Sequence, residues 1–137
     1  MFVNKLVAVM NDKIELGVVM NALAHMCMGF GAEIGKDLLR LTHYIDADGG
    51  SHPHISEMPF MILKAKNSNK IASLKASALE RGIKCVDFTD TMTIGTYQDQ
   101  LERTQKTKGV DLNYYGIVLF GDWDTVSELT KKFSLFK

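Results

Sequence analysis

Apolar residues along this chain fall into short continuous runs that alternate with segments of helical spacing. A short continuous apolar run between turn residues is typical of a buried strand. Residues 39–45 differ, because apolar and polar positions alternate there with the period of two that indicates a half-buried strand. The turn residues 48–50 follow it, and residues 51–57 are expected to continue as a loop. The runs that predict buried strands are residues 2–10, 58–65, 83–88 and 114–120, with residues 134–136 as a short edge strand.

Helix starts are predicted from residues that can accept hydrogen bonds from free backbone N–H groups. Asp12 with Glu15, and Thr125 with Glu128, have the spacing of a capping box, so a helix is expected to begin at each place. Ser68 is expected to cap a third helix.

The helices differ in how much apolar surface they carry. The first runs towards Gly31 and is apolar nearly all round, which predicts burial on more than one side. The second ends at Gly82, where a C-terminal glycine is favoured. The third, residues 95–108, is polar, with Tyr97 and Leu101 as its only apolar anchors. The last is expected to turn Val126, Leu129 and Phe133 to the core.

The order β-α-β-β-α-β-α-β-α predicts a single α/β domain over residues 1–137. The hairpin-like segment 39–65 makes a purely parallel sheet unfavourable, so a mixed sheet of four to five strands flanked by helices is expected. A chain of 137 residues with 46% hydrophobic positions can bury its own core, which excludes a disordered chain.

Charge argues against a nucleic-acid partner. Sixteen basic and sixteen acidic residues cancel, so no overall field attracts a polyanion. Arg103, Lys106 and Lys108 would make a local basic surface with Lys131, Lys132 and Lys137, but a solvated helix face is the favoured interpretation.

Neither the N-terminus nor the cysteines indicate export. Residues 2–10 read as a buried strand and lack a signal-peptide cleavage site. The longest apolar stretch, residues 14–30, is interrupted by polar side chains and falls short of a clean membrane span. Cys27 and Cys85 lie apart in apolar surroundings, which is typical of buried reduced thiols in a cytoplasmic protein.

No metal and no cofactor is predicted. Residues 46–57 superficially resemble a calcium loop, but Ser51 stands where the sharp turn needs glycine. His43, His52 and His54 follow no zinc spacing. The chain has no phosphate loop, dinucleotide fingerprint or nucleophile elbow.

Two groups of polar side chains are candidates for a site. Asn21 and His25 share a helix face, where the imidazole would act as a general base and the amide would bind substrate; the alternative is a core histidine satisfied by backbone carbonyls. Asp90, Thr91 and Thr93 follow a strand, at the end where α/β sheets bind ligands; the alternative is an aspartate that caps the next turn. Cys27 lies on a different helix face from His25. Tyr114, Tyr115 and Trp123 are interpreted as packing residues; the alternative is that an aromatic edge lines a ligand pocket.

Several motifs resemble an uncharacterised bacterial family, domain of unknown function 2000. They are NDKIELGVVMNALAH at 11–25, YIDADGGSHPHIS at 44–56, FTDTM at 88–92 and GIVLFGDWDTVSELTKKFSLF at 116–136. That family is similar in fold to the type II peptidyl-tRNA hydrolases, which are small mixed α/β domains and commonly form homodimers.

The chain matches the functional residues of the type II peptidyl-tRNA hydrolases at some positions and departs from them at others. Gly17, His25 and Asp90 match the hydrolase pattern, which implies catalytic roles for His25 and Asp90 and a ligand contact at Gly17. Val18 stands where the hydrolases have lysine, and Ala22 where they have glutamine. Valine has neither charge nor donor to steady a developing oxyanion, so peptidyl-tRNA hydrolase activity is not expected.

Three functional classes therefore remain. The first is an enzyme that hydrolyses an ester or amide in a small-ligand pocket around His25 and Asp90, with Gly17, Asn21, Thr91 and Thr93 as ligand contacts. The second is a non-catalytic binder of a small metabolite or an RNA end. The third is an oligomerisation module, supported by the apolar first helix. We expect a small-molecule ligand, a homodimer and no membrane.

Overall fold

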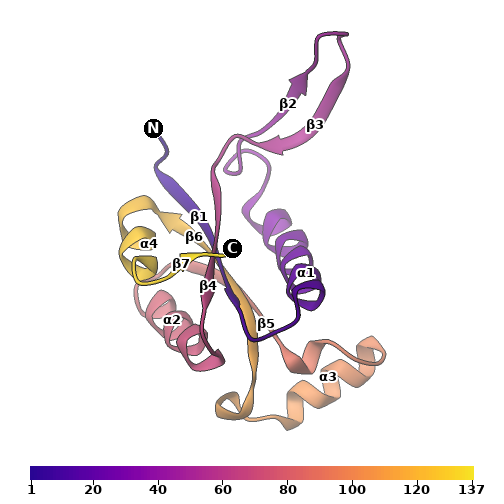
Figure 1. Ribbon diagram of the computed structural model, residues 1–137, viewed down its shortest axis with the longest axis vertical. Helices are drawn as coiled ribbons and strands as arrows, with labels where there is room; N and C mark the ends of the chain where they lie inside the picture. Colours follow the sequence, from indigo (N-terminus) through magenta and orange to yellow (C-terminus); the bar gives the residue numbers. More distant parts are fainter.

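Five strands form one mixed sheet in the computed structural model, which describes residues 1–137, and two further strands form a separate hairpin (Figure 1). The strands are β1 (Asn4–Asn11), β2 (Leu41–Ile45), β3 (Ser51–Ser56), β4 (Phe60–Ala65), β5 (Lys84–Thr89), β6 (Tyr114–Asp122) and β7 (Ser134–Leu135). The helices are α1 (Leu16–Ile34), α2 (Ser68–Glu80), α3 (Tyr97–Lys106) and α4 (Trp123–Thr130), with 3₁₀ turns η1 (Asp90–Met92) and η2 (Gly109–Asp111).

The strand order in the main sheet is β5-β6-β1-β4-β7. β1 and β4 are parallel, and every other neighbouring pair is antiparallel. The predicted mixed α/β sheet of up to five strands is therefore confirmed, and the short edge strand near the C-terminus is β7. The chain crosses from β1 to β4 through α1 and the hairpin.

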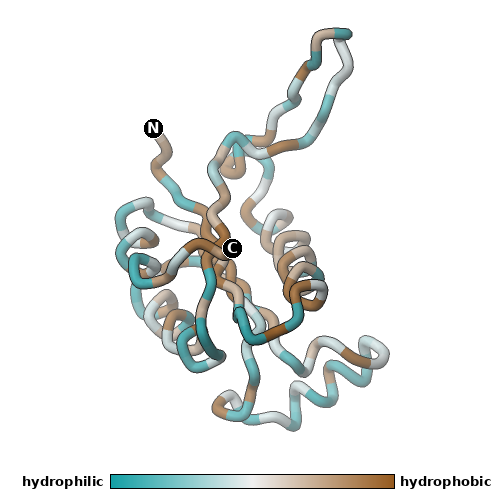
Figure 2. Tube along the Cα trace, viewed as in Figure 1, coloured by the Kyte–Doolittle hydropathy of each residue, from teal (hydrophilic) through white to brown (hydrophobic).

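The sheet separates two apolar clusters because successive side chains of a strand point to opposite faces. On β1, Ala8 and Met10 pack on the side of α1, whereas Val7 and Val9 pack on the side of α2 and α4. Figure 1 shows α1 on one side of the sheet and α2 with α4 on the other, and Figure 2 shows hydrophobic colouring concentrated in the sheet and along α1. The molecule therefore has three layers.

The hairpin of β2 and β3 forms an arm that projects beyond the C-terminal end of α1 (Figure 1). The prediction of a loop over residues 51–57 is wrong, because β3 pairs antiparallel with β2 from Leu41 opposite Ser56 to Ile45 opposite Ser51. At its tip Asp46 Oδ1 accepts hydrogen bonds from the N–H groups of Asp48 and Gly50. Asp46 therefore stabilises a turn.

Helix α1 buries one stripe, not several sides as predicted. The stripe consists of Val19, Ala22, Met26, Phe30 and Ile34. The opposite face is apolar yet exposed, with Met20 61% and Met28 73% accessible. α1 is the only helix long and apolar enough to cross a bilayer by length and composition; its stripe packs on the sheet, as in the core helix of a soluble domain.

Three of the predicted helix caps are wrong: one is absent and two are replaced by neighbouring residues. α1 has no side-chain cap, so the box from Asp12 to Glu15 is not formed. Asn67, not Ser68, caps α2. At α4 the cap is Asp122, whose Oδ2 accepts hydrogen bonds from both N–H and Oγ1 of Thr125. Asn67 and Asp122 each accept a hydrogen bond from the backbone N–H three residues later. The cap of α2 is therefore one residue earlier than predicted, and the cap of α4 is three residues earlier.

Helix α3 buries no side chain, and the expected anchors Tyr97 and Leu101 are exposed. Polar contacts hold it instead. The Arg103 guanidinium donates to the carbonyl oxygens of Thr91 and Ile94 at 3.1 and 3.0 Å, and Thr104 Oγ1 donates to Thr91 Oγ1 at 2.9 Å. α3 is thus attached through η1 and the turn after it.

Candidate functional site

A hollow of about 360 Å³ lies where the start of α1 meets the end of β5 and the start of β6. Gly17, Asn21 and Thr93, three of the residues predicted to contact a ligand, line it together. Segments far apart in the sequence therefore converge at the sheet end, as expected from the position of polar residues after strands. The other lining residues are Val18, Phe88, Ile94 and Tyr115.

An aromatic wall runs along one side of this hollow. The rings of Phe88 and Tyr115 lie 6.3 Å apart, and the imidazole of His25 stacks on Phe88 at 6.1 Å with an interplanar angle of 30°. His25 itself is exposed, so the alternative of an enclosed core histidine is wrong. His25 lies next to the hollow, because it stacks on the Phe88 ring that lines it.

Asp90 forms two hydrogen bonds with the backbone of Asn113. Its Oδ1 accepts a hydrogen bond from the Asn113 N–H at 3.1 Å, and its own N–H donates to the Asn113 carbonyl at 3.0 Å. Thr93 Oγ1 donates to the Asp90 carbonyl at 2.7 Å. Asp90 thus joins the end of β5 to the residue before β6. This structural role resembles the alternative interpretation, in which Asp90 stabilises a turn.

Thr91 does not line the hollow. It is buried, and its hydroxyl lies 2.7 Å from Thr89 Oγ1 and 2.9 Å from Thr104 Oγ1. Thr91 therefore lies between two other threonine hydroxyls and connects η1 to α3, away from the hollow.

Three polar side chains around the hollow have no intramolecular hydrogen bond: the amide of Asn21, the imidazole of His25 and the phenol of Tyr115. Burial raises the pKa of the Tyr115 phenol, and the negative charge of Asp90 raises it further. The phenol therefore stays protonated at neutral pH and can donate a hydrogen bond. The hollow therefore offers apolar aromatic surface with a few unpaired hydrogen-bonding groups beside it.

The cysteines are free thiols and half-buried, not fully buried as predicted. Burial raises the pKa of Cys27 and of Cys85, so both thiols stay protonated at neutral pH. Cys27 packs against the core on the α1 side. A protonated, half-buried thiol is a poor nucleophile, consistent with its interpretation as a packing residue.

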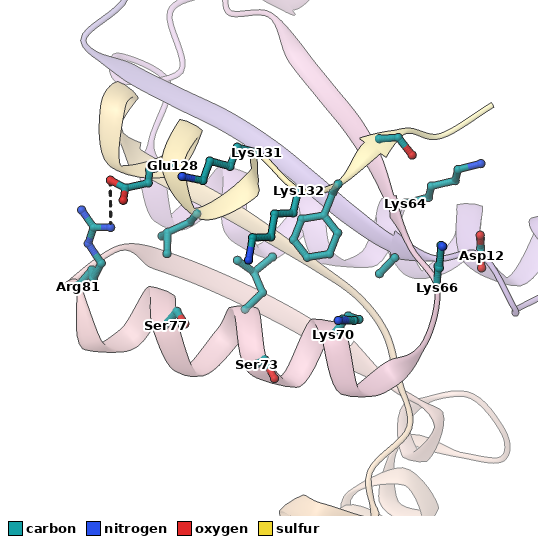
Figure 3. Close-up of a pocket in the computed structure, with 15 residues that line it drawn as sticks. Asp12, Lys64, Lys66, Lys70, Ser73, Ser77, Arg81, Glu128, Lys131 and Lys132 are labelled. Carbon is teal, nitrogen blue, oxygen red and sulfur yellow. Dashed lines mark ion pairs between the residues drawn. The ribbon is translucent and has the colours of Figure 1, made fainter.

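A second and larger hollow, about 660 Å³, lies on the opposite side of the sheet between α2 and the end of α4 (Figure 3). We call it the basic groove, because six of its lining residues are Lys64, Lys66, Lys70, Arg81, Lys131 and Lys132. One expectation from the sequence is that Lys131 and Lys132 share a basic surface with Arg103, Lys106 and Lys108. That grouping is wrong, because Arg103 is committed to the turn after η1 and the neighbours of Lys131 and Lys132 are on α2.

Comparison with known proteins identifies the family. The family model described as "Protein of unknown function (DUF2000)" matches residues 4–137, nearly the whole chain. The chain belongs to this family. A solved structure, the protein of unknown function Atu0240 from Agrobacterium tumefaciens, is similar with a TM-score of 0.84 and 19% identity, and the match covers 100% of both chains. That likeness shows that the DUF2000 chain shares its fold with Atu0240. No curated protein matches the chain.

Proposed function

We propose that this DUF2000 protein binds a small, uncharged, planar ligand in the hollow beside α1. The observation that carries the proposal is the convergence of three unpaired polar groups, on Asn21, His25 and Tyr115, around the Phe88 ring. Small-molecule sites are typically mostly apolar hollows with a few polar groups that fix orientation. A volume of about 360 Å³ suits a ligand of one or two rings.

Binding is supported better than hydrolysis. A general base works best when a third group orients it, and His25 forms no hydrogen bond with a carboxylate. The Asp90 carboxylate is engaged by the Asn113 N–H. Val18 lines the hollow where the type II peptidyl-tRNA hydrolases have a lysine, so similarity to those enzymes is kept as a hypothesis about fold alone. No RNA end is proposed as ligand, because no cation lines this hollow.

Benzamide is a suitable probe, since its ring can lie on the Phe88 wall and its amide can pair with Asn21. A fragment of this size is expected to bind with a dissociation constant in about the millimolar range. Calorimetry should show that Asn21→Ala weakens binding severalfold, whereas Asn69→Ala, an exposed asparagine on α2, leaves it unchanged. Cyclohexanecarboxamide, which lacks the flat ring, should bind more weakly.

The proposal fails if benzamide binds the wild type and Asn21→Ala equally well, or if neither amide binds at ~10 mM, well above the expected dissociation constant.

We further propose a homodimer in the cytoplasm, with the arm of each copy covering α1 of the other. The outward face of α1 carries no charge from Leu16 to Ala32, so it offers nothing to a charged partner. The arm is a two-stranded hairpin with both faces exposed, and such a hairpin is only marginally stable alone in water. The arm extends beyond the C-terminal end of α1 (Figure 1), so two copies related by a two-fold axis can each place their arm over α1 of the other. Two free thiols fit a reducing compartment.

A further inference from the structure

The basic groove collects positive charge from three separate parts of the chain. Lys64 and Lys66 come from β4 and the residues after it, Lys70 from α2, and Lys131 and Lys132 from the end of α4. Figure 3 shows Lys132 extending from the end of α4 toward α2, across the hollow. The fold, not the local sequence, creates this concentration of charge.

This charge is not neutralised within the molecule. Six basic and two acidic side chains line the groove, which gives a net charge of +4. The only ion pair among them joins Arg81 to Glu128 at 3.5 Å, and none of the five lysines forms one. Clustered like charges repel, so an anion seated between them would remove a repulsion as well as form new contacts. The N-terminus of α2, which is the positive end of its dipole, lies beside Lys66 and Lys70 and also favours a bound anion.

The groove also has an apolar floor and hydroxyl groups. Leu74, Leu129 and Phe133 form the floor together with Ala65. Ser73 and Ser77, one turn apart on α2, line the same wall as Lys70 and supply small hydrogen-bonding groups between the cations. A ligand that fits must therefore combine a strongly anionic group with an apolar part.

We propose that the basic groove binds a small phosphorylated metabolite of the nucleoside-diphosphate kind. Its phosphates lie among Lys66, Lys70 and Lys132, where ammonium groups form charge-assisted hydrogen bonds. Its planar, less polar part lies on the floor at Phe133. The volume of about 660 Å³ is within the usual range for small-molecule sites.

A small ligand fits better than a nucleic-acid strand. The chain as a whole has no net charge, so the long-range attraction that brings polyanions to basic proteins is absent. The cations also face one another across a hollow bounded by two helices instead of following an open track along the surface. This second site is independent of the hollow beside α1.

The test is calorimetric titration with inorganic pyrophosphate and with ADP, at low and at moderate salt. ADP is expected to bind with one-to-one stoichiometry and more tightly than pyrophosphate, because only ADP uses the apolar floor. Affinity should fall as salt rises. The double variant Lys70→Gln with Lys132→Gln should weaken ADP binding at least about tenfold, the loss expected for charged hydrogen bonds.

The matched control is Lys84→Gln with Lys106→Gln, which removes the same charge from exposed lysines outside the groove. It should leave ADP affinity unchanged. The proposal is overturned if both double variants weaken ADP equally, if neither probe binds, or if a single-stranded oligonucleotide binds the groove more tightly than ADP. Asn21→Ala should not affect ADP, so failure here is distinguishable from failure of the hollow beside α1.

Discussion

At the scale of single residues, the position of His25 is predictable from the sequence, whereas its exposure to solvent is not. Its helix position beside Asn21 was predicted from spacing, and the structure places Asn21 in the hollow and His25 on the Phe88 ring that lines it. Its exposure could not be predicted, because an apolar helix gives no sign of which face is left uncovered. His25 is therefore available to a ligand and contributes little to the core.

Replacing His25 is expected to leave the fold intact. His25→Ala should change the free energy of unfolding by less than about 0.5 kcal/mol, as is usual for an exposed side chain. Phe88→Ala, which empties a buried position in the same wall, should cost about 3–5 kcal/mol. Urea denaturation measures both. A loss of several kcal/mol in His25→Ala would show that the imidazole is structural.

The Lys75–Asp87 ion pair gives a pH-dependent prediction. Burial alone lowers the pKa of Lys75, but the hydrogen bond to Asp87 and its charge outweigh burial, so the pKa is raised. A raised lysine pKa stabilises the fold below the unfolded pKa of about 10.4 and stops doing so as pH rises through the folded value.

Asp87→Asn should therefore destabilise the protein by about 1 kcal/mol near pH 8, a modest figure because a third of the Lys75 side chain is exposed. The difference should shrink above about pH 10.5. Unfolding measured across this range checks the sign, and a difference that grows in strong alkali would contradict it.

At the scale of elements, the strands inside the sheet were predictable because they are apolar on both faces. β3 was not, since Ser51–Ser56 contains serine, histidine and proline, and only pairing with β2 makes it a strand. The caps of α2 and α4 were misplaced because asparagine, aspartate, serine and threonine stand close together there, and sequence does not show which oxygen reaches the free N–H. The basic groove was missed because its lysines are scattered between residues 64 and 132.

Helix α3 is expected to open independently of the rest of the domain, because it buries no side chain and depends on Arg103 and Thr104. Arg103→Met removes two hydrogen bonds to backbone carbonyls. Hydrogen exchange should then accelerate over Tyr97–Lys106 while β1 and β6 keep their protection. Unchanged exchange in α3 would show that other contacts hold it, and faster exchange everywhere would show that α3 belongs to the core.

At the scale of the whole molecule, the arm and the outer face of α1 expose large hydrophobic side chains, among them Met20, Met28, Tyr44, Ile45 and Ile55. Exposed apolar surface that is contiguous often marks an interface. In the proposed homodimer these surfaces cover each other. Sedimentation should give twice the chain mass of 15.3 kDa. Met20→Glu, on the outer face of α1, should yield monomers, whereas Leu79→Glu, equally exposed on α2, should not. A wild-type monomer at high concentration would contradict the dimer.

The most direct test of ligand binding beside α1 is a map of backbone amide shifts as benzamide is added to labelled protein. We expect saturable shifts at Gly17, Asn21, Phe88, Ile94 and Tyr115, which surround one hollow. Little change is expected along α2 and α4, on the other side of the sheet. Shifts confined to the basic groove, or shifts that never saturate, would contradict the account.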